Sequence, residues 1–103
     1  MEITNLSQQA FTTLDSLVEA FEKLDTIEVD YDGKILQICL PDGKQYLINF
    51  HGPSNQLWVS SPFSGAHHFE HKKGNWQSTR ANIDLKSLLK LEFNNQIGYG
   101  VDL

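Results

Sequence analysis

The period of the hydrophobic pattern changes near residue 25, and no other feature constrains the fold as strongly. Over residues 5–24 apolar side chains recur every three or four positions, as in an amphipathic helix: Leu6, Ala10, Leu14, Leu17, Phe21 and Leu24. From Ile27 onward apolar and polar residues alternate, which is typical of strands with one buried face. The change predicts an α+β fold that begins with a helix.

Turn residues divide the alternating region into short strands. Asp32-Gly33 and the segment 41–44 are hairpin signals, and residues 52–55 contain a Gly-Pro break. We expect strands at 27–31, 34–40, 46–50, 56–60 and 67–71, and a short strand at Trp76.

A second helix is predicted to follow the strands, with Asp84 as its N-cap. It would end near Asn95 and carry an apolar side formed by Leu85, Leu88, Leu89 and Phe93. One-sided alternation predicts two helices packed on one face of a single antiparallel sheet, with the other face open to solvent.

Length and composition narrow the class of protein. The 103 residues predict a single domain, 1–103. The only cysteine, Cys39, cannot form an internal disulfide, and one thiolate cannot replace the roughly four that hold a resident iron–sulfur cluster. We expect Cys39 to be a buried structural thiol. No apolar run approaches the roughly 20 residues of a membrane span. Residues 1–5 lack the pattern of a targeting segment, so we expect a cytoplasmic protein.

Charge is distributed very unevenly along the chain. Residues 1–32 carry eight acids and one base, a net charge of −7, whereas the remainder carries five acids and seven bases, a net charge of +2. An acidic pole disfavours nucleic acid and anionic membranes as partners. It favours cations or a basic protein surface.

Carboxylates in this pole recur with a regular spacing. Asp15, Glu19 and Glu22 share one side of the first predicted helix, and Glu28, Asp30 and Asp32 alternate along the first predicted strand. Oxygen ligands in such rows suit hard cations, although no EF-hand loop is present and any site would be open and weak. The alternative is a solvated acidic face that only maintains solubility.

Trp58 is a candidate anchor for a protein partner. If Leu57 and Val59 face the helices, Gln56, Trp58 and Ser60 face solvent, where a tryptophan is a natural binding anchor. A register slip of one residue would instead place Trp58 in the core, and alternation alone leaves both possibilities open.

The histidines favour no dedicated metal site. His67 and His71 would share one face of a strand and His68 the other, so the three do not converge, and His51 stands apart. His68, on the open face, is a candidate partner contact. No phosphate loop, nucleophile elbow or HExxH motif occurs, so we expect no conventional enzyme.

Several segments together resemble the frataxin family. They are Tyr46-Leu47-Ile48-Asn49, Gln56 through Pro62, Ser64-Gly65 and Gly74-Asn75-Trp76, preceded by the acidic helix at 13–22 and followed by Leu85 and Leu88-Leu89. The resemblance runs in order from about residue 11 to 93, and the compact length is similar to the bacterial branch, CyaY.

The resemblance implies an iron-binding protein of iron–sulfur cluster assembly, an iron donor or a regulator of the cysteine desulfurase–scaffold complex. It implies weak surface binding of Fe²⁺ or Fe³⁺ along a ridge that maps to Asp15, Glu19, Glu22, Glu28, Asp30 and Asp32. It also implies partner contacts at Asn49, Gln56 and Trp58, to which we add Ser60 and His68. We expect a monomer that can associate further with iron. The alternative function is a ferroxidase that detoxifies iron.

Overall fold

The computed structural model describes residues 6–98, 101 and 103, and within them it contains two α-helices, a single turn of 3-10 helix and six strands. The helices are α1 (Leu6–Glu22) and α2 (Leu85–Gln96), and the 3-10 turn is η1 (Gly52–Ser54). The strands are β1 (Glu28–Tyr31), β2 (Ile35–Cys39), β3 (Gln45–His51), β4 (Gln56–Ser61), β5 (Gly65–Lys72) and β6 (Asn75–Ser78).

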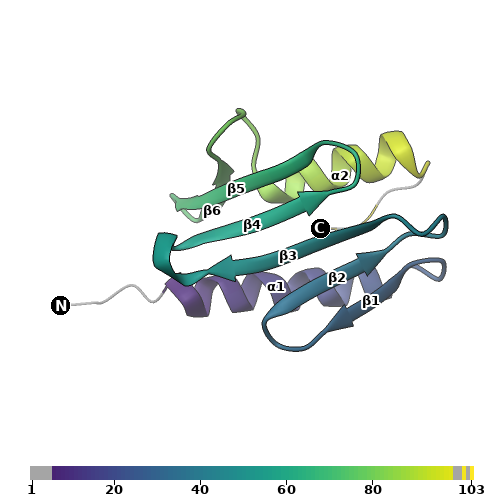
Figure 1. The fold of residues 1–103 in the computed structure, drawn as a ribbon, viewed down its shortest axis with the longest axis horizontal. Coiled ribbons are helices and arrows are strands. Elements are labelled where there is room, and N and C mark those ends of the chain that lie inside the picture. Colours follow the sequence, from purple (N-terminus) through teal and green to yellow (C-terminus); the bar gives the residue numbers. More distant parts are fainter. Residues whose placement is uncertain (1–5, 99–100, 102) are drawn as a thin grey trace.

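The strands form one antiparallel sheet whose spatial order follows the chain, β1 to β6, and both helices lie behind the same face (Figure 1). This confirms the predicted fold class. The predicted boundaries agree with the structure to within a few residues, and the predicted helix start at residue 5 lies outside the described residues.

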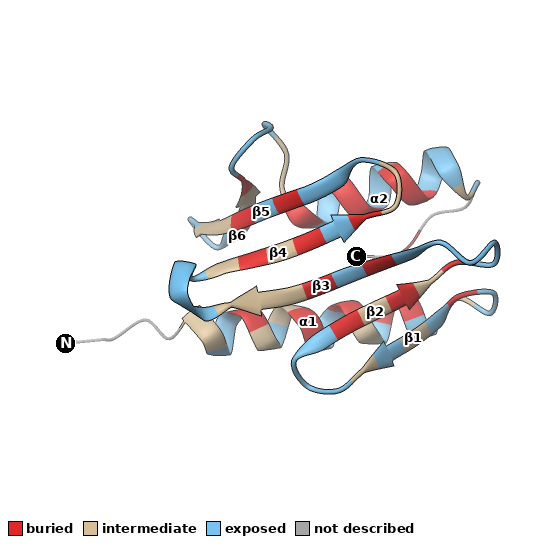
Figure 2. Ribbon diagram, viewed as in Figure 1, coloured by how far each residue is buried: buried red, intermediate tan, exposed pale blue. Residues whose placement is uncertain are grey.

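A hydrophobic core fills the layer between the sheet and the helices. From α1 it takes Ala10, Leu14, Leu17, Ala20 and Phe21. Phe21 meets Phe93 of α2 with ring centroids 4.8 Å apart, so the two helices are joined through aromatic rings. The strands β2 to β6 contribute alternate residues, which is why buried segments recur between less buried ones along β2, β3 and β4 in Figure 2.

Aspartates fix the ends of several elements. The Asp32 carboxylate accepts the backbone N–H groups of Lys34 and Ile35, both at 2.8 Å, and so closes the β1–β2 turn, in which Gly33 has a φ of 92°. The Asp84 carboxylate accepts the Ser87 N–H at 2.8 Å, which confirms the predicted N-cap of α2.

The end of the chain returns to the core. Val101 is only 5% exposed, and Leu103 packs against the same cluster of buried side chains. In the described part of the chain no helix is long and apolar enough to cross a membrane.

The expectation of a buried Cys39 is wrong. Leu36 and Ile38 are fully buried on the helix side of β2, so the alternating pleat turns Cys39 to the open face. There the thiol is half-buried, and its Sγ lies 3.6 Å from Gln45 Oε1.

Candidate metal-binding ridge and docking face

We call Asp15, Glu19, Glu22, Glu28, Asp30 and Asp32 the acidic ridge. All six side chains are exposed. The first three lie along α1, and the others lie in or just after β1, which is an edge strand of the sheet (Figure 1). The fold therefore brings both predicted rows of carboxylates to the β1 edge of the sheet.

The two rows lie on opposite sides of the β1 edge. Val29 and Tyr31 turn toward α1 and pack against the core, so Glu28 and Asp30 point to the open face of the sheet. Tyr31 links the rows: burial raises the pKa of its phenol, and the Asp15 and Asp32 carboxylates raise it further.

The ridge is an open surface. Within residues 6–98, 101 and 103, no group of three or more His, Cys, Asp or Glu side chains is arranged closely enough to enclose a metal ion. One oxygen of Asp32 already holds the β1–β2 turn, because the N–H groups of Ile35 and Lys34 donate to its Oδ1. These hydrogen bonds hold the pKa of the carboxyl below its usual range. What the ridge can supply is a row of carboxylate oxygens that share a cation with water.

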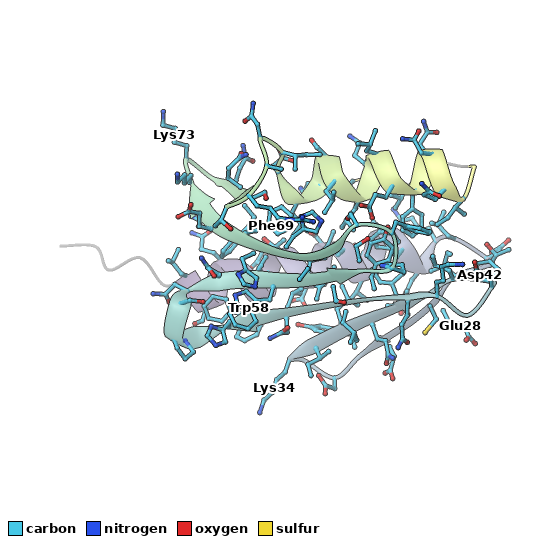
Figure 3. All side chains as sticks on the ribbon, turned by 45° about the horizontal axis from the view of Figure 1, so that its top comes forward. Glu28, Lys34, Asp42, Trp58, Phe69 and Lys73 are labelled. Atoms are coloured by element: carbon cyan, nitrogen blue, oxygen red, sulfur yellow. The ribbon has the colours of Figure 1, made fainter. Side chains whose placement is uncertain are left out.

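We call Asn49, Gln56, Trp58, Ser60 and His68 the docking face. Leu57 and Val59 are 0% and 2% exposed, so the register that turns Trp58 to solvent is confirmed. Trp58 stands opposite Asn49 on β3 and His68 on β5, and it is labelled on the sheet in Figure 3. The five side chains share the face that the helices leave open.

A stack of three rings forms the centre of the docking face. His51 lies on one side of the Trp58 indole with centroids 3.8 Å apart, and His68 lies on the other at 4.4 Å. Trp58 Nε1 donates to Gln56 Oε1 at 3.0 Å, which further fixes the ring. In the sequence His51 is distant from the other histidines, but its diagonal position across the β3–β4 pair brings it beside Trp58.

A buried carboxylate, Glu92, was missed. It is 8% exposed and accepts hydrogen bonds from the hydroxyls of Tyr46 at 2.7 Å and Ser61 at 2.6 Å, and from the Ser64 hydroxyl. Burial, followed by the Glu92 carboxylate, strongly raises the pKa of Tyr46. The sequence pattern could have predicted this burial, because Glu92 follows Leu88 by four residues and so lies on the buried side of its helix.

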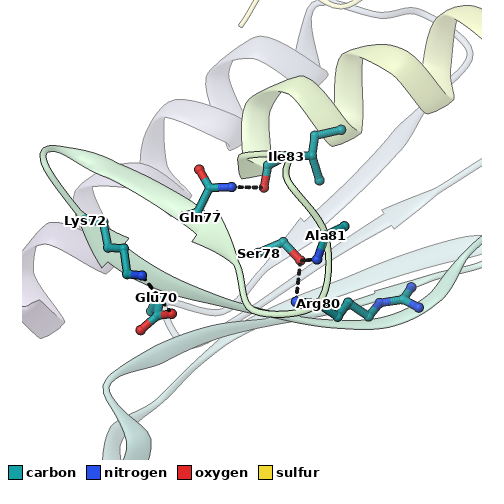
Figure 4. A network of polar contacts seen from close by, with 7 residues as sticks. All are labelled: Glu70, Lys72, Gln77, Ser78, Arg80, Ala81 and Ile83. Atoms are coloured by element: carbon teal, nitrogen blue, oxygen red, sulfur yellow. Dashed lines mark hydrogen bonds and ion pairs between the residues drawn. The ribbon is translucent and has the colours of Figure 1, made fainter.

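His67 extends this network toward the surface. Its Nε2 lies 2.7 Å from Ser64 Oγ, and the Arg80 guanidinium lies 2.9 Å from Nε2 and 3.3 Å from Nδ1. Burial and the Arg80 charge lower the pKa of His67, so the ring is held neutral. Ser78 Oγ accepts the N–H groups of Arg80 and Ala81, which holds the Arg80 loop in place (Figure 4).

The other histidines lie as the alternation predicted. His71 is on the same side of β5 as His67 and meets Trp76 edge-on, with centroids 5.0 Å apart, while His68 faces the opposite way. The imidazoles therefore serve packing and the docking face, and they do not converge on one point.

The sequence matches a family of known proteins over most of its length. Residues 1–99 match the frataxin-like domain family. A mitochondrial frataxin homologue of Schizosaccharomyces pombe is 34% identical over 80% of this chain, and a mitochondrial frataxin-like protein of Leishmania donovani is 24% identical over 95%. The chain spans 57% and 56% of the length of these two relatives.

Solved structures share the fold. The frataxin of Psychromonas ingrahamii, from the CyaY family, superposes with a TM-score of 0.85 at 22% identity, covering 96% of this chain and 97% of its own. Trimeric frataxin of Saccharomyces cerevisiae, solved in complex with ferrous iron, superposes with a TM-score of 0.72 at 30% identity, covering 96% and 92%.

Proposed function

This chain belongs to the frataxin family, and we propose on that basis that it is an iron-binding protein of iron–sulfur cluster assembly. In this proposal it supplies iron to the cysteine desulfurase–scaffold complex or regulates that complex. The observation that carries the proposal is the exposed acidic ridge beside an open, helix-free sheet face. A yeast relative at 30% identity was solved with ferrous iron, which supports the iron part.

The chemistry of the ridge supports weak binding of Fe²⁺ or Fe³⁺ at the surface. Carboxylate oxygens discriminate poorly between hard cations, so calcium and manganese would compete with iron. Iron is therefore a cargo that the ridge holds loosely and can pass on.

A binding role fits this surface better than an enzymatic one. Metal-centred catalysis needs ligands fixed around an ion with a position left open for the reacting molecule. The described residues offer exposed carboxylates and no enclosed ligand set. Oxygen consumption in the presence of ferrous iron, compared between the parent and ridge variants, tests the ferroxidase alternative.

The docking face supports the partner part of the proposal. It offers a pre-stacked tryptophan with amide and hydroxyl groups around it, on a sheet surface that neither helix covers. A monomer that associates further with iron, and a cytoplasmic location, are parts of the same proposal.

Anaerobic titration of ¹⁵N-labelled protein with Fe²⁺ tests the iron site. Signals of Asp15, Glu19, Glu22, Glu28 and Asp30 should broaden first, and Ca²⁺ should reverse part of the effect. Asp30→Asn should weaken the broadening, whereas Glu70→Gln, on β5 and four strands away from β1, should not. First broadening at His67, His68 and His71 would overturn the assignment.

A further inference from the structure

Two shallow hollows meet on the open face of the sheet. The first, about 200 Å³, is lined by Leu47, Asn49, Trp58, Val59, Ser60, Ala66 and His68. The second, about 290 Å³, is lined by Asp30, Asp32, Ile35, Gln37 and Leu47. Leu47 lines both, so the two hollows adjoin at its side chain, and we call the pair the cross-strand trough.

The strand register explains the direction of the trough. One row of paired residues crosses the sheet from His68 through Trp58 and Asn49 to Ile35. The next row crosses from Ala66 through Ser60, Leu47 and Gln37 to Asp30. The trough lies between these rows and runs across the strands. From β5 to β1 it spans four strand spacings, or roughly 19 Å.

The middle of the trough is unusually apolar for a surface. Among the described residues three large hydrophobic side chains are exposed, and two of them, Ile35 at 48% and Leu47 at 38%, line this depression. Apolar side chains gathered in an exposed depression mark an interaction site more often than isolated ones do.

The two ends of the trough differ in charge. One end is formed by the ring stack around Trp58, and the other by the exposed carboxylates of Asp30 and Asp32. Asp30 has no ion-pair partner among the described residues, so its charge is available to a ligand. A bound segment that complements this surface carries an apolar group at the centre and a cation near β1.

We propose that the trough binds an extended segment of a partner protein in which a lysine or arginine lies three or four residues from a large apolar side chain. The spacing follows from geometry: the hollow beside Trp58 is two to three strand spacings from Asp30, about 10–14 Å, and an extended chain covers this in three or four residues at roughly 3.3 Å each. The proposal rests on the proposed partner role and specifies the chemistry of the partner.

Synthetic octapeptides test the proposal directly. The probe acetyl-Ser-Gly-Leu-Ser-Gly-Ser-Arg-Gly-amide is compared with versions in which alanine replaces leucine or glutamate replaces arginine. In metal-free buffer the probe should shift the NMR signals of Leu47, Asn49 and the Trp58 indole. Loss of the leucine should weaken binding about tenfold, and reversal of the charge about threefold or more.

Surface variants supply the matched controls. Leu47→Gln and Asp30→Asn should each weaken binding of the probe. Leu91→Gln alters a side chain that is 51% exposed on α2, and Asp25→Asn alters an exposed acid outside the trough, so neither should matter. The proposal is overturned if the three peptides bind alike, if the shifted signals lie elsewhere, or if Leu47→Gln binds the probe as the parent does.

The desulfurase–scaffold complex separates this proposal from the one on which it rests. If Trp58→Ala loses affinity for the complex while Leu47→Gln and Asp30→Asn keep it, the partner role stands and the trough proposal fails. If the parent does not bind the complex at all but selects the leucine–arginine probe, the trough stands and the proposed partner is wrong.

Discussion

His51 and Trp58 lie face to face, with ring centroids 3.8 Å apart and ring planes 14° apart. With His68 on the opposite side, both faces of the indole are covered before any partner arrives. Little side-chain freedom is then left to lose on binding, which favours affinity. In the proposed partner role, the partner would meet Trp58 at the edge of its ring and contact the two imidazoles as well.

Removal of His51 tests this arrangement. His51→Ala should leave the fold intact, move the NMR signals of the Trp58 ring protons, and cost about 0.5–1.5 kcal/mol of stability, the usual worth of an aromatic pair. It should also weaken binding to the desulfurase–scaffold complex, because the indole is less well held. His71→Ala is the control, because His71 contacts Trp76 on the other side of the sheet. Unchanged Trp58 signals and unchanged affinity would show that the stack is incidental.

The Glu92 network should contribute strongly to stability. Glu92→Ala removes the acceptor of the buried Tyr46 and Ser61 hydroxyls, and an unsatisfied buried donor costs about 1–3 kcal/mol. Urea unfolding should therefore show a loss of about 2–4 kcal/mol. Glu92→Gln, which keeps one acceptor oxygen, should lose less. Glu70→Ala, at a surface ion pair, should change stability by less than about 1 kcal/mol. An equal loss of stability in Glu92→Ala and Glu70→Ala would contradict the account.

His67 should make stability depend on pH. Burial and the Arg80 charge hold the pKa of folded His67 below its ordinary value of about 6.5. Below that pH the unfolded chain binds a proton that the folded chain does not, so the contribution is complete above about pH 6.5 and is lost as the pH falls.

Melting temperatures at pH 7.5 and 5.5 measure this effect. His67→Gln keeps a neutral polar side chain, so its melting temperature should fall less between the two values than that of the parent. His71→Gln should behave as the parent does. If the melting temperature of His67→Gln falls between the two pH values as much as that of the parent, other groups cause the loss of stability in acid.

The acidic ridge should cost stability in the absence of metal. Neighbouring carboxylates on α1 repel one another, so Glu19→Gln in metal-free buffer should melt no lower than the parent and gain a few tenths of a kcal/mol. Asp15→Asn removes another of these charges and should also melt no lower. A clear drop in melting temperature for either variant would indicate that these acids serve structure rather than metal binding.

Periodicity was sufficient for the architecture. The helical spacing of Leu14, Leu17 and Phe21 predicts which side of α1 faces the core. Alternation around Trp58 left two registers open, and only the structure, with Leu57 and Val59 buried, decides between them. Because the turns at Asp32 and Asp42 are fixed by local hydrogen bonds, they were predictable as well.

Contacts between distant segments were not predictable in this way. Glu92 meets Tyr46 and Ser61 across 46 and 31 residues, and the Trp58 stack depends on how β3, β4 and β5 align. The prediction for Cys39 was wrong because it relied on the general tendency of cysteine to be buried. The alternation of β2 places Cys39 on the face opposite to the buried Leu36 and Ile38. The sequence predicted the two rows of acids in the ridge. Only the fold shows that the row on α1 and the row on β1 lie on opposite sides of the β1 edge.

The affinity of Trp58→Ala for the desulfurase–scaffold complex tests the central claim most directly. A core tryptophan cut to alanine costs about 3–5 kcal/mol of stability. Trp58 on the open face should cost less, mainly the worth of its two ring stacks, but its loss should cost about 2 kcal/mol or more of binding. Trp58→Ala should keep its circular dichroism spectrum, still bind iron at the ridge, and lose affinity for the complex. A variant that unfolds, or that binds the complex as tightly as the parent, would contradict the claim that Trp58 anchors a partner from the open face.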